Sequence, residues 1–158
     1  HELMEFFLRG AGGFLPVAMI LLFALALGDI ANLLGTGDYV ARLVQGSIPQ
    51  FLLLPLLFLT SSFIAFSIGS SWGTFAIMIP LTLQIALSLE LSPPLFLAAV
   101  LSGSVFGDHA SPISDTTVVA SMASATDHID HVRTQLPYAL ISAAIATLGF
   151  LIAGITAL

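Results

Sequence analysis

Stretches of about 20 apolar residues, joined by short polar connections, restrict this chain to a fold inside a lipid bilayer. A helix of about 20 residues crosses the hydrocarbon core of a membrane, which is about 30 Å thick. Because 58% of the residues are hydrophobic and only 8% are charged, with a mean hydropathy of +1.08, a water-soluble domain of this size is excluded. The sequence therefore predicts an all-α polytopic membrane protein, with residues 1–158 as one transmembrane domain. We expect spans at about 14–34 and 136–158, a hairpin at 51–89 and a broken helix at 95–125.

The few charged side chains exclude several classes of function. Three arginines, no lysine and nine acidic residues give a formal net charge of −6, which argues against binding to nucleic acid. The chain contains no cysteine, so it has neither a disulfide nor a thiolate metal site. It also lacks a zinc-protease helix motif and a nucleophile elbow. We therefore expect no enzyme and no cofactor.

A polar segment, GDHASPISDTT, interrupts the apolar sequence at 107–117. Pro112 removes a backbone N–H and clashes with the carbonyl of Asp108, so we expect a broken transmembrane helix here. Non-helical backbone at membrane depth persists only where protein or a water-filled cavity surrounds it. An acidic residue at the centre of a membrane helix costs about 2.5–3.5 kcal/mol on insertion scales, which indicates that Asp108 and Asp115 have a function. The alternative is that both lie in an ordinary exposed loop.

The oxygen atoms of this segment form a ligand set for a hard cation. Carboxylate and hydroxyl oxygens, with the carbonyls freed by the break, suit Na⁺ or Li⁺ better than Zn²⁺ or Cu²⁺. If the two carboxyls lie close together, burial and like charge favour a proton on one of them near neutral pH, so Na⁺ and H⁺ would compete for the pair. The candidate ligands at the break are Asp108, Ser111, Ser114, Asp115 and Thr116.

Two further residues are candidates for a proton relay. His109 directly follows Asp108 inside the membrane element. Asp29 lies late in the first apolar stretch, where it is either a proton carrier or a residue at the membrane–water boundary.

A second interruption, SIGSSWGT at 67–74, lies between the two apolar arms of 51–89. Its glycines permit tight turns, and Ser70, Ser71 and Thr74 supply further oxygen ligands for the expected Na⁺ shell. Interrupted apolar segments of this kind are typical of the binding site of a secondary transporter, so we predict a re-entrant hairpin. A plain turn between two full spans is the alternative.

The polar segment DHIDH carries His128 and His131, spaced i, i+3 as on one face of a helix. Such a spacing is found among metal ligands, and this remains an alternative. The interpretation we favour is a solvated loop whose charge follows pH, because histidine titrates near neutrality.

Three blocks extend over nearly the whole chain: GTGDYVARLV at 35–44, FSIGSSWGTFAIMIPL at 66–81 and SGSVFGDHASPISDTTVVASMASATDHIDHVRTQLPYALI at 102–141. Together they resemble the NhaC-type Na⁺/H⁺ antiporter family. The resemblance implies exchange of cytoplasmic Na⁺ for external H⁺ across the cytoplasmic membrane of a prokaryote, for pH and sodium homeostasis. It also implies a multi-pass transporter built from inverted repeats, of which this chain is the carboxy-terminal half. The implied partners are the lipid bilayer, the missing amino-terminal half and a second copy in a homodimer.

Other functions stay open at this point. Proteins that resemble this family also move organic acids, so a malate/lactate type exchanger coupled to Na⁺ or H⁺ is the nearest alternative. An anionic substrate needs a basic or helix-N-terminal site, and no Arg or Lys lies inside an apolar stretch, which favours cation exchange. A channel or a non-transporting membrane scaffold is an alternative of a different class, and a channel would not couple Na⁺ to H⁺.

Overall fold

The computed structural model describes residues 2–13 and 15–157, and these residues form helices joined by short connections, with no strand among them. The all-α prediction is therefore confirmed. Phe14 and Leu158, which bound two of the expected spans, lie outside the described residues. In chain order the elements are α1 (Glu2–Gly13), α2 (Leu15–Leu33), α3 (Thr36–Ser47), the short 3-10 helix η1 (Gln50–Leu52), α4 (Leu53–Ile68), α5 (Ser71–Ser88), α6 (Pro93–Ala110), α7 (Asp115–Ala123) and α8 (His128–Ala157).

Three helical segments of the described residues are long and apolar enough to cross a membrane. They are Gln50–Ile68, Ser71–Ser88 and His128–Ala157. At a rise of about 1.5 Å per residue, the first two extend over about 27–28 Å each, close to the thickness of the hydrocarbon core. Each arm of the pair expected at 51–89 therefore has the length of a full span.

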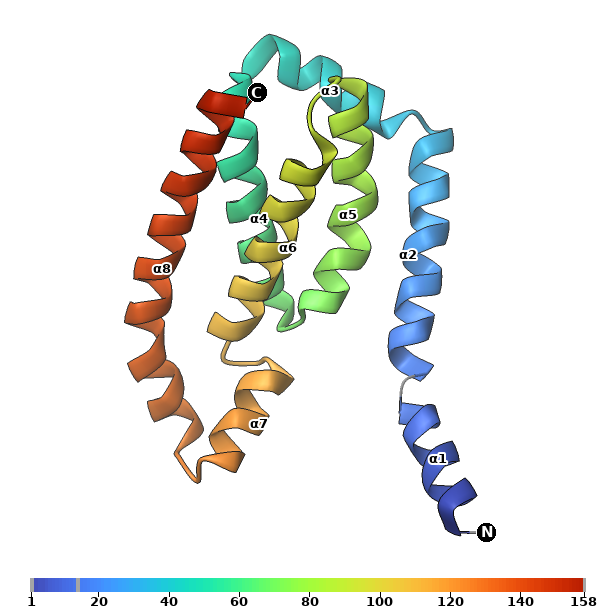
Figure 1. The fold of residues 1–158 in the computed structure, drawn as a ribbon, viewed down its shortest axis with the longest axis vertical. Coiled ribbons are helices and arrows are strands. Elements are labelled where there is room, and N and C mark those ends of the chain that lie inside the picture. The colour runs from blue at the N-terminus through green and yellow to red at the C-terminus, as the bar shows by residue number, and fades with distance from the viewer. Residues whose placement is uncertain (1, 14, 158) are drawn as a thin grey trace.

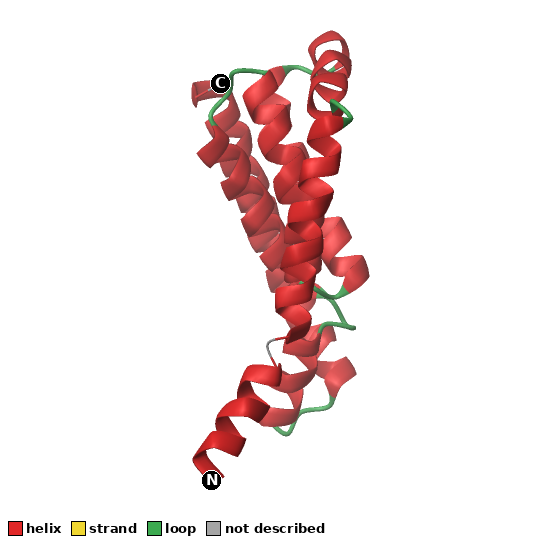
Figure 2. Cartoon of the chain, turned by 90° about the vertical axis from the view of Figure 1, so that its right-hand side faces the viewer, coloured by secondary structure: helices red, strands yellow, loops and turns green. Residues whose placement is uncertain are grey.

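The helices α4, α5 and α6 form a bundle beside α8, while α2 packs on the other side against α5 (Figure 1). The short helix α3 lies across one end of this bundle (Figure 1). At the other end, α8 runs on beyond the turn between α4 and α5, and α7 lies beside its first turns (Figure 1). Figure 2 shows from the side how α1 continues away from the bundle at the end opposite the carboxy terminus.

The closest contact in the bundle joins α4 to α6. A Cβ atom on Gly103 would collide with the carbonyl oxygen of Phe58, and one on Gly107 would collide with the carbonyl oxygen of Ser62. Glycines four residues apart thus let the two backbones touch, as small-xxx-small patterns do in membrane helices. This contact sets the height of α6 against α4 and therefore the position of Asp108, which follows Gly107.

The interior of the bundle changes from apolar to polar along its length. Near η1 and the end of α5 it is an apolar core of Leu53, Leu54, Phe58, Ile85, Ala86, Leu89, Phe96, Ala99 and Ala143. At the opposite end, where α4 turns into α5 and α6 breaks into α7, the small Ala65 and Ala110 are buried together with five polar side chains: Ser71, Thr74, Asp108, Ser111 and Ser114.

Candidate functional site

The break in the helix expected at 95–125 lies where Pro112 predicts it. Helix α6 ends at Ala110, and Ser111 continues in an extended conformation with φ −74° and ψ 131°. The Ser111 hydroxyl donates to the carbonyl oxygen of Phe66 at 2.7 Å, and the backbone N–H of Ile113 donates to Ser111 Oγ at 3.3 Å. The loop at 111–114 is thereby tied to the last turn of α4.

The turn between α4 and α5 packs directly on this loop, and this turn with the first residue of α5 forms the hairpin tip, residues 69–71. Gly69 has a left-handed backbone with φ +72°, and a Cβ atom there would lie 2.9 Å from the carbonyl oxygen of Ile113. Ser70 caps α5, because its Oγ accepts a hydrogen bond from the backbone N–H of Gly73 at 3.2 Å. The glycine and hydroxyl content of SIGSSWGT thus explains both the turn and its close approach to the break.

Asp108 lies where the hairpin tip and the break meet, and its side chain is only 4% exposed. Ser71 Oγ donates to Asp108 Oδ2 at 3.0 Å, and Ser114 Oγ donates to Asp108 Oδ1 at 2.5 Å. Ser71 is the first residue of α5 and Ser114 is the N-cap of α7. The positive ends of two helix dipoles therefore lie beside this carboxyl, which lowers the cost of burying a negative charge.

Within the described part of the chain, the partners of the Asp108 carboxyl are hydroxyl donors and none is cationic. Among the described residues the ion pair is that of Arg9 with Glu5 on α1, at 2.6 Å. A buried carboxyl surrounded by hydroxyl oxygens is a site that can hold either a proton or a hard cation.

Asp115, which the sequence predicts to share the cation site with Asp108, has different surroundings. Its side chain is exposed, and its Oδ1 accepts a hydrogen bond from the N–H of Thr116 at 2.8 Å. No hydrogen bond between the two carboxyls occurs in the part of the chain that the structure describes. The physical reason is that Asp115 begins α7, so its carboxyl serves the free N–H groups of its own helix.

Two of the other predicted ligands lie close to this centre. Thr116 Oγ1 is 2.8 Å from Ser114 Oγ, so it is one hydrogen bond away from Asp108. Thr74 is fully buried and donates to the carbonyl oxygen of Ser70 at 3.0 Å.

The two candidates for a proton relay both have exposed side chains. His109 is exposed, and its Nδ1 bonds to the carbonyl oxygen of Val105 at 3.0 Å within α6. Asp29 is exposed on α2, which packs on α5 and α3. Neither side chain bonds to Asp108 within the described ranges.

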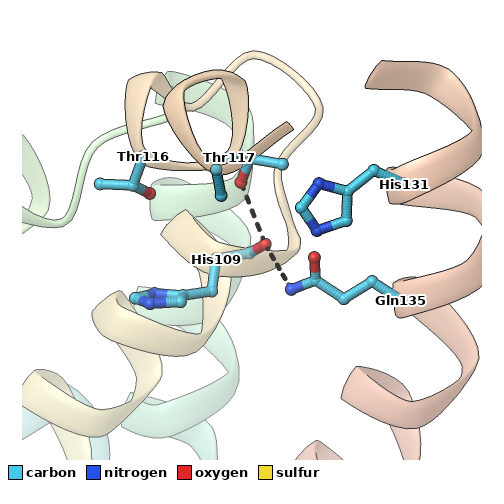
Figure 3. Close-up of a pocket in the computed structure, with 6 residues that line it drawn as sticks. His109, Thr116, Thr117, His131 and Gln135 are labelled. Carbon is cyan, nitrogen blue, oxygen red and sulfur yellow. Dashed lines mark hydrogen bonds between the residues drawn. The ribbon is translucent and has the colours of Figure 1, made fainter. Parts of the chain in front are cut away.

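Two side chains of helix α8, Gln135 and His128, contact the backbone at the break, and the sequence does not predict these contacts. Gln135 Nε2 donates to the carbonyl oxygen of His109 at 3.1 Å, and Thr117 Oγ1 donates to the same oxygen at 3.3 Å (Figure 3). His128 Nε2 lies 2.6 Å from the carbonyl oxygen of Pro112, which can only accept. The polar start of α8 therefore holds both the end of α6 and the loop that follows it. The one signal for this in the sequence is the run of polar residues at 126–135.

The two histidines of DHIDH bond to a hydroxyl rather than forming a metal site. Ser121 Oγ is 3.1 Å from His128 Nδ1 and 2.7 Å from His131 Nδ1. Among the described residues no group of three or more His, Cys, Asp or Glu side chains is placed to hold a metal ion. Both histidines are half-buried in the first turns of α8, so the expected solvated loop is a helix start packed on α7.

A cavity of about 320 Å³ opens beside the break, between α6, α7 and α8 (Figure 3). It is lined by His109, Thr116, Thr117, Ala120, His131 and Gln135. Thr116 thus faces the cavity while its hydroxyl contacts Ser114 on the way to Asp108.

Comparison with known proteins gives a consistent set of relatives. The family described as the Na⁺/H⁺ antiporter family matches residues 1–155. An uncharacterized protein of Haemophilus influenzae is 44% identical over 140 residues, covering 87% of this chain and 27% of that protein. The arginine/ornithine antiporter ArcD of Halobacterium salinarum is 38% identical over 104 residues, which cover 66% of this chain and 21% of ArcD. The malate-2H⁺/Na⁺-lactate antiporter of Bacillus subtilis is 34% identical over 137 residues, covering 82% of this chain and 29% of that antiporter.

Further matches in Haemophilus influenzae and Alkalihalophilus pseudofirmus carry the name Na⁺/H⁺ antiporter, the second of them NhaC. The resemblance that the sequence blocks indicate is therefore confirmed. The chain spans between 21% and 29% of the length of the three relatives described above. No solved structure matches it.

Proposed function

This chain belongs to the Na⁺/H⁺ antiporter family, and we propose that the protein exchanges Na⁺ for H⁺ across the cytoplasmic membrane of a prokaryote. The observation that carries this proposal is the buried carboxyl of Asp108, which is held by the hydroxyls of Ser71 and Ser114. The carboxyl of Asp108 can therefore serve both as an oxygen ligand for a hard cation and as the acceptor of a proton.

Exchange follows from the energy of the empty site. An ionised carboxylate buried without a bound cation is unfavourable, whereas a protonated carboxyl and a carboxylate with Na⁺ are both neutral overall. If the helices rearrange only when Asp108 is neutral, each rearrangement carries either Na⁺ or H⁺. Because the two ions compete for Asp108, their movements in opposite directions are coupled.

We propose that the Na⁺ shell is centred on Asp108 and includes hydroxyls of the hairpin tip and the loop at 111–114. Ser71 and Ser114 already contact the carboxyl, and Ser111 in the same loop as Ser114 donates to the carbonyl oxygen of Phe66 in α4. The remaining proposed members are Ser70 and Thr74 on the first turn of α5. Asp115 and Thr116, which the sequence also predicts as ligands, begin α7 with exposed side chains and lie outside the proposed shell. Li⁺ has the same ligand preference as Na⁺ and is expected to compete for the site.

An exchanger of organic acids coupled to Na⁺ or H⁺ is the second candidate. It is favoured by the Bacillus subtilis relative, which is named as a malate-2H⁺/Na⁺-lactate antiporter and covers 82% of this chain. The structure gives a reason to prefer the cation exchanger. Two helix N-termini at the site, which would suit an organic anion, already hold the carboxyl of Asp108.

The inverted repeat, the re-entry of the α4–α5 hairpin and a homodimer stay predictions. Re-entry is tested in the full-length protein, in which single cysteines are placed along 66–74 and labelled from each side of the membrane. Labelling of the hairpin tip from the side on which both arms begin supports re-entry, and labelling only from the opposite side supports two full spans.

The proposed function is tested with the full-length protein in everted membrane vesicles from bacteria that lack their own Na⁺/H⁺ antiporters. A pH gradient is established, and Na⁺, malate with Na⁺, and arginine are then added to separate samples. We expect Na⁺ alone to collapse the gradient, and vesicles without the protein to keep it. Collapse only with malate or only with arginine would replace cation exchange by exchange of that organic substrate.

A further inference from the structure

The two carboxylate oxygens of Asp108 face different parts of the protein. Oδ2 accepts its hydrogen bond from Ser71 at the hairpin tip, and Oδ1 accepts from Ser114 at the start of α7. One oxygen is therefore joined to the hairpin and the other to the broken helix.

The Oδ1 side continues as a chain of hydroxyls. Ser114 is fully buried, and its Oγ lies 2.8 Å from Oγ1 of Thr116, which is exposed and lines the cavity of about 320 Å³. Ser114 has a single hydroxyl proton, and it points to Asp108, so the proton between Ser114 and Thr116 belongs to Thr116. The free lone pairs of Thr116 are then directed away from Ser114, where a water molecule in the cavity can donate to them.

We propose that Thr116 and Ser114 form the relay that carries protons between this cavity and Asp108, and this inference rests on the proposed Na⁺/H⁺ exchange. A proton from the cavity binds Thr116 Oγ1 while the Thr116 proton passes to Ser114 Oγ and the Ser114 proton passes to Asp108 Oδ1. Each oxygen forms one O–H bond and each hydroxyl breaks one, so the net result is one proton added to Asp108. The reverse sequence releases the proton when Na⁺ binds.

The groups around the cavity suit this role. His109 of α6 and His131 of α8 line it, and Asp115 lies next to Thr116 on α7. The ring nitrogens of an imidazole donate or accept hydrogen bonds, so the cavity wall has polar atoms that can hold water beside Thr116. Thr117, the other hydroxyl in the cavity wall, donates instead to the carbonyl oxygen of His109.

The relay also separates the two ions within one site. Protons reach Oδ1 through the broken helix, and the hydroxyl at Oδ2 is that of Ser71 at the hairpin tip, whose oxygen remains free to serve Na⁺. Removing the Thr116 hydroxyl should therefore slow steps that need a proton and spare steps that need only Na⁺.

The test uses the full-length protein in proteoliposomes and compares two reactions, Na⁺/H⁺ exchange and exchange of radioactive Na⁺ for unlabelled Na⁺, which needs no proton. We expect Thr116→Val, which keeps the shape of threonine and removes the hydroxyl, to slow Na⁺/H⁺ exchange by about 10²-fold. Exchange of Na⁺ for Na⁺ should stay at the wild-type rate, and Thr116→Ser should restore Na⁺/H⁺ exchange. Thr134→Val is the matched control, because Thr134 is exposed and its hydroxyl bonds within α8.

Equal slowing of both reactions by Thr116→Val would overturn the relay, because Thr116 would then serve the Na⁺ site or the fold. Full Na⁺/H⁺ exchange in Thr116→Val would overturn it as well. A wild-type protein that exchanges Na⁺ in neither reaction would instead overturn the proposed function itself. The comparison thus distinguishes a failure of the relay from a failure of the antiporter.

Discussion

Ser71 and Asp108, 37 positions apart in the sequence, are joined by a hydrogen bond of 3.0 Å from Oγ to Oδ2. The bond connects the first residue of α5 with the last turn of α6 in the interior of the bundle. Any movement of the hairpin tip relative to α6 must therefore change the surroundings of the buried carboxyl. This relationship gives the proposed antiporter a physical link between the ion held by Asp108 and the arrangement of its helices.

The first prediction concerns Ser71 itself. Replacement by alanine removes one hydroxyl ligand of the proposed Na⁺ site, and a hydrogen bond to a charged group contributes about 1.5–3 kcal/mol. We expect Ser71→Ala to raise the Na⁺ concentration for half-maximal exchange at least about tenfold. The measurement is the Na⁺ dependence of the collapse of a pH gradient in everted vesicles.

Ser67→Ala serves as the control for this variant. Ser67 belongs to the same SIGSSWGT segment, but its side chain is exposed and its hydroxyl donates to the carbonyl oxygen of Phe63 in its own helix. Its Na⁺ dependence should match that of the wild type. Equal shifts in the two variants would show that Ser71 has no special part in holding Na⁺.

The second prediction concerns the contact between α4 and α6. A methyl group on Gly107 collides with the carbonyl oxygen of Ser62, and overpacking of this kind costs about 1–3 kcal/mol. We expect Gly107→Ala to unfold at a lower temperature than the wild type in detergent. In the matched variant Gly149→Ala the added methyl group meets open space, so no such loss of thermal stability is expected. Unfolding of both variants at the wild-type temperature would contradict the close contact between the backbones of α4 and α6.

The third prediction concerns the support that α8 gives to the break. His128→Phe removes the donor to the carbonyl oxygen of Pro112, and a hydrogen bond of this type stabilises by about 0.5–1.5 kcal/mol. We expect hydrogen–deuterium exchange of the loop amides at 111–114 to become about fivefold faster, since 1.4 kcal/mol corresponds to about tenfold. Asp130→Asn, an exposed change in the same turn of α8, should leave this exchange unaltered. Unchanged protection of the loop in His128→Phe would mean that α8 does not hold it.

The sequence predicts each local element of this site, but it does not predict how these elements are arranged around the buried carboxyl. Pro112 indicates the break between α6 and α7, and Gly69 indicates the turn at the hairpin tip, because both effects act within a few residues of the chain. The different surroundings of Asp108, which is buried, and Asp115, which is exposed, were not predictable in this way. The direction of each carboxyl depends on how α7 leaves the loop at 111–114 and on which helix termini surround it.

The contribution of α8 was unpredictable for a similar reason. Gln135 and His128 are 26 and 16 positions from the carbonyls that they contact, and neither has a local pattern that indicates this pairing. The contacts arise because the glycines of α6 and the length of α8 bring the polar start of α8 to the level of the break. Long-range packing of this kind appears only in the folded chain.

The central claim is that Na⁺ and H⁺ bind in turn to the single carboxyl of Asp108. It is tested most directly by adding Na⁺ to the purified full-length protein in weakly buffered detergent solution and recording released protons with a pH indicator. Asp108→Asn and Asp115→Asn are measured beside the wild type, since one carboxyl is buried in the site and the other is exposed. Our account predicts proton release from the wild type and from Asp115→Asn, and none from Asp108→Asn. Undiminished release from Asp108→Asn would contradict the account.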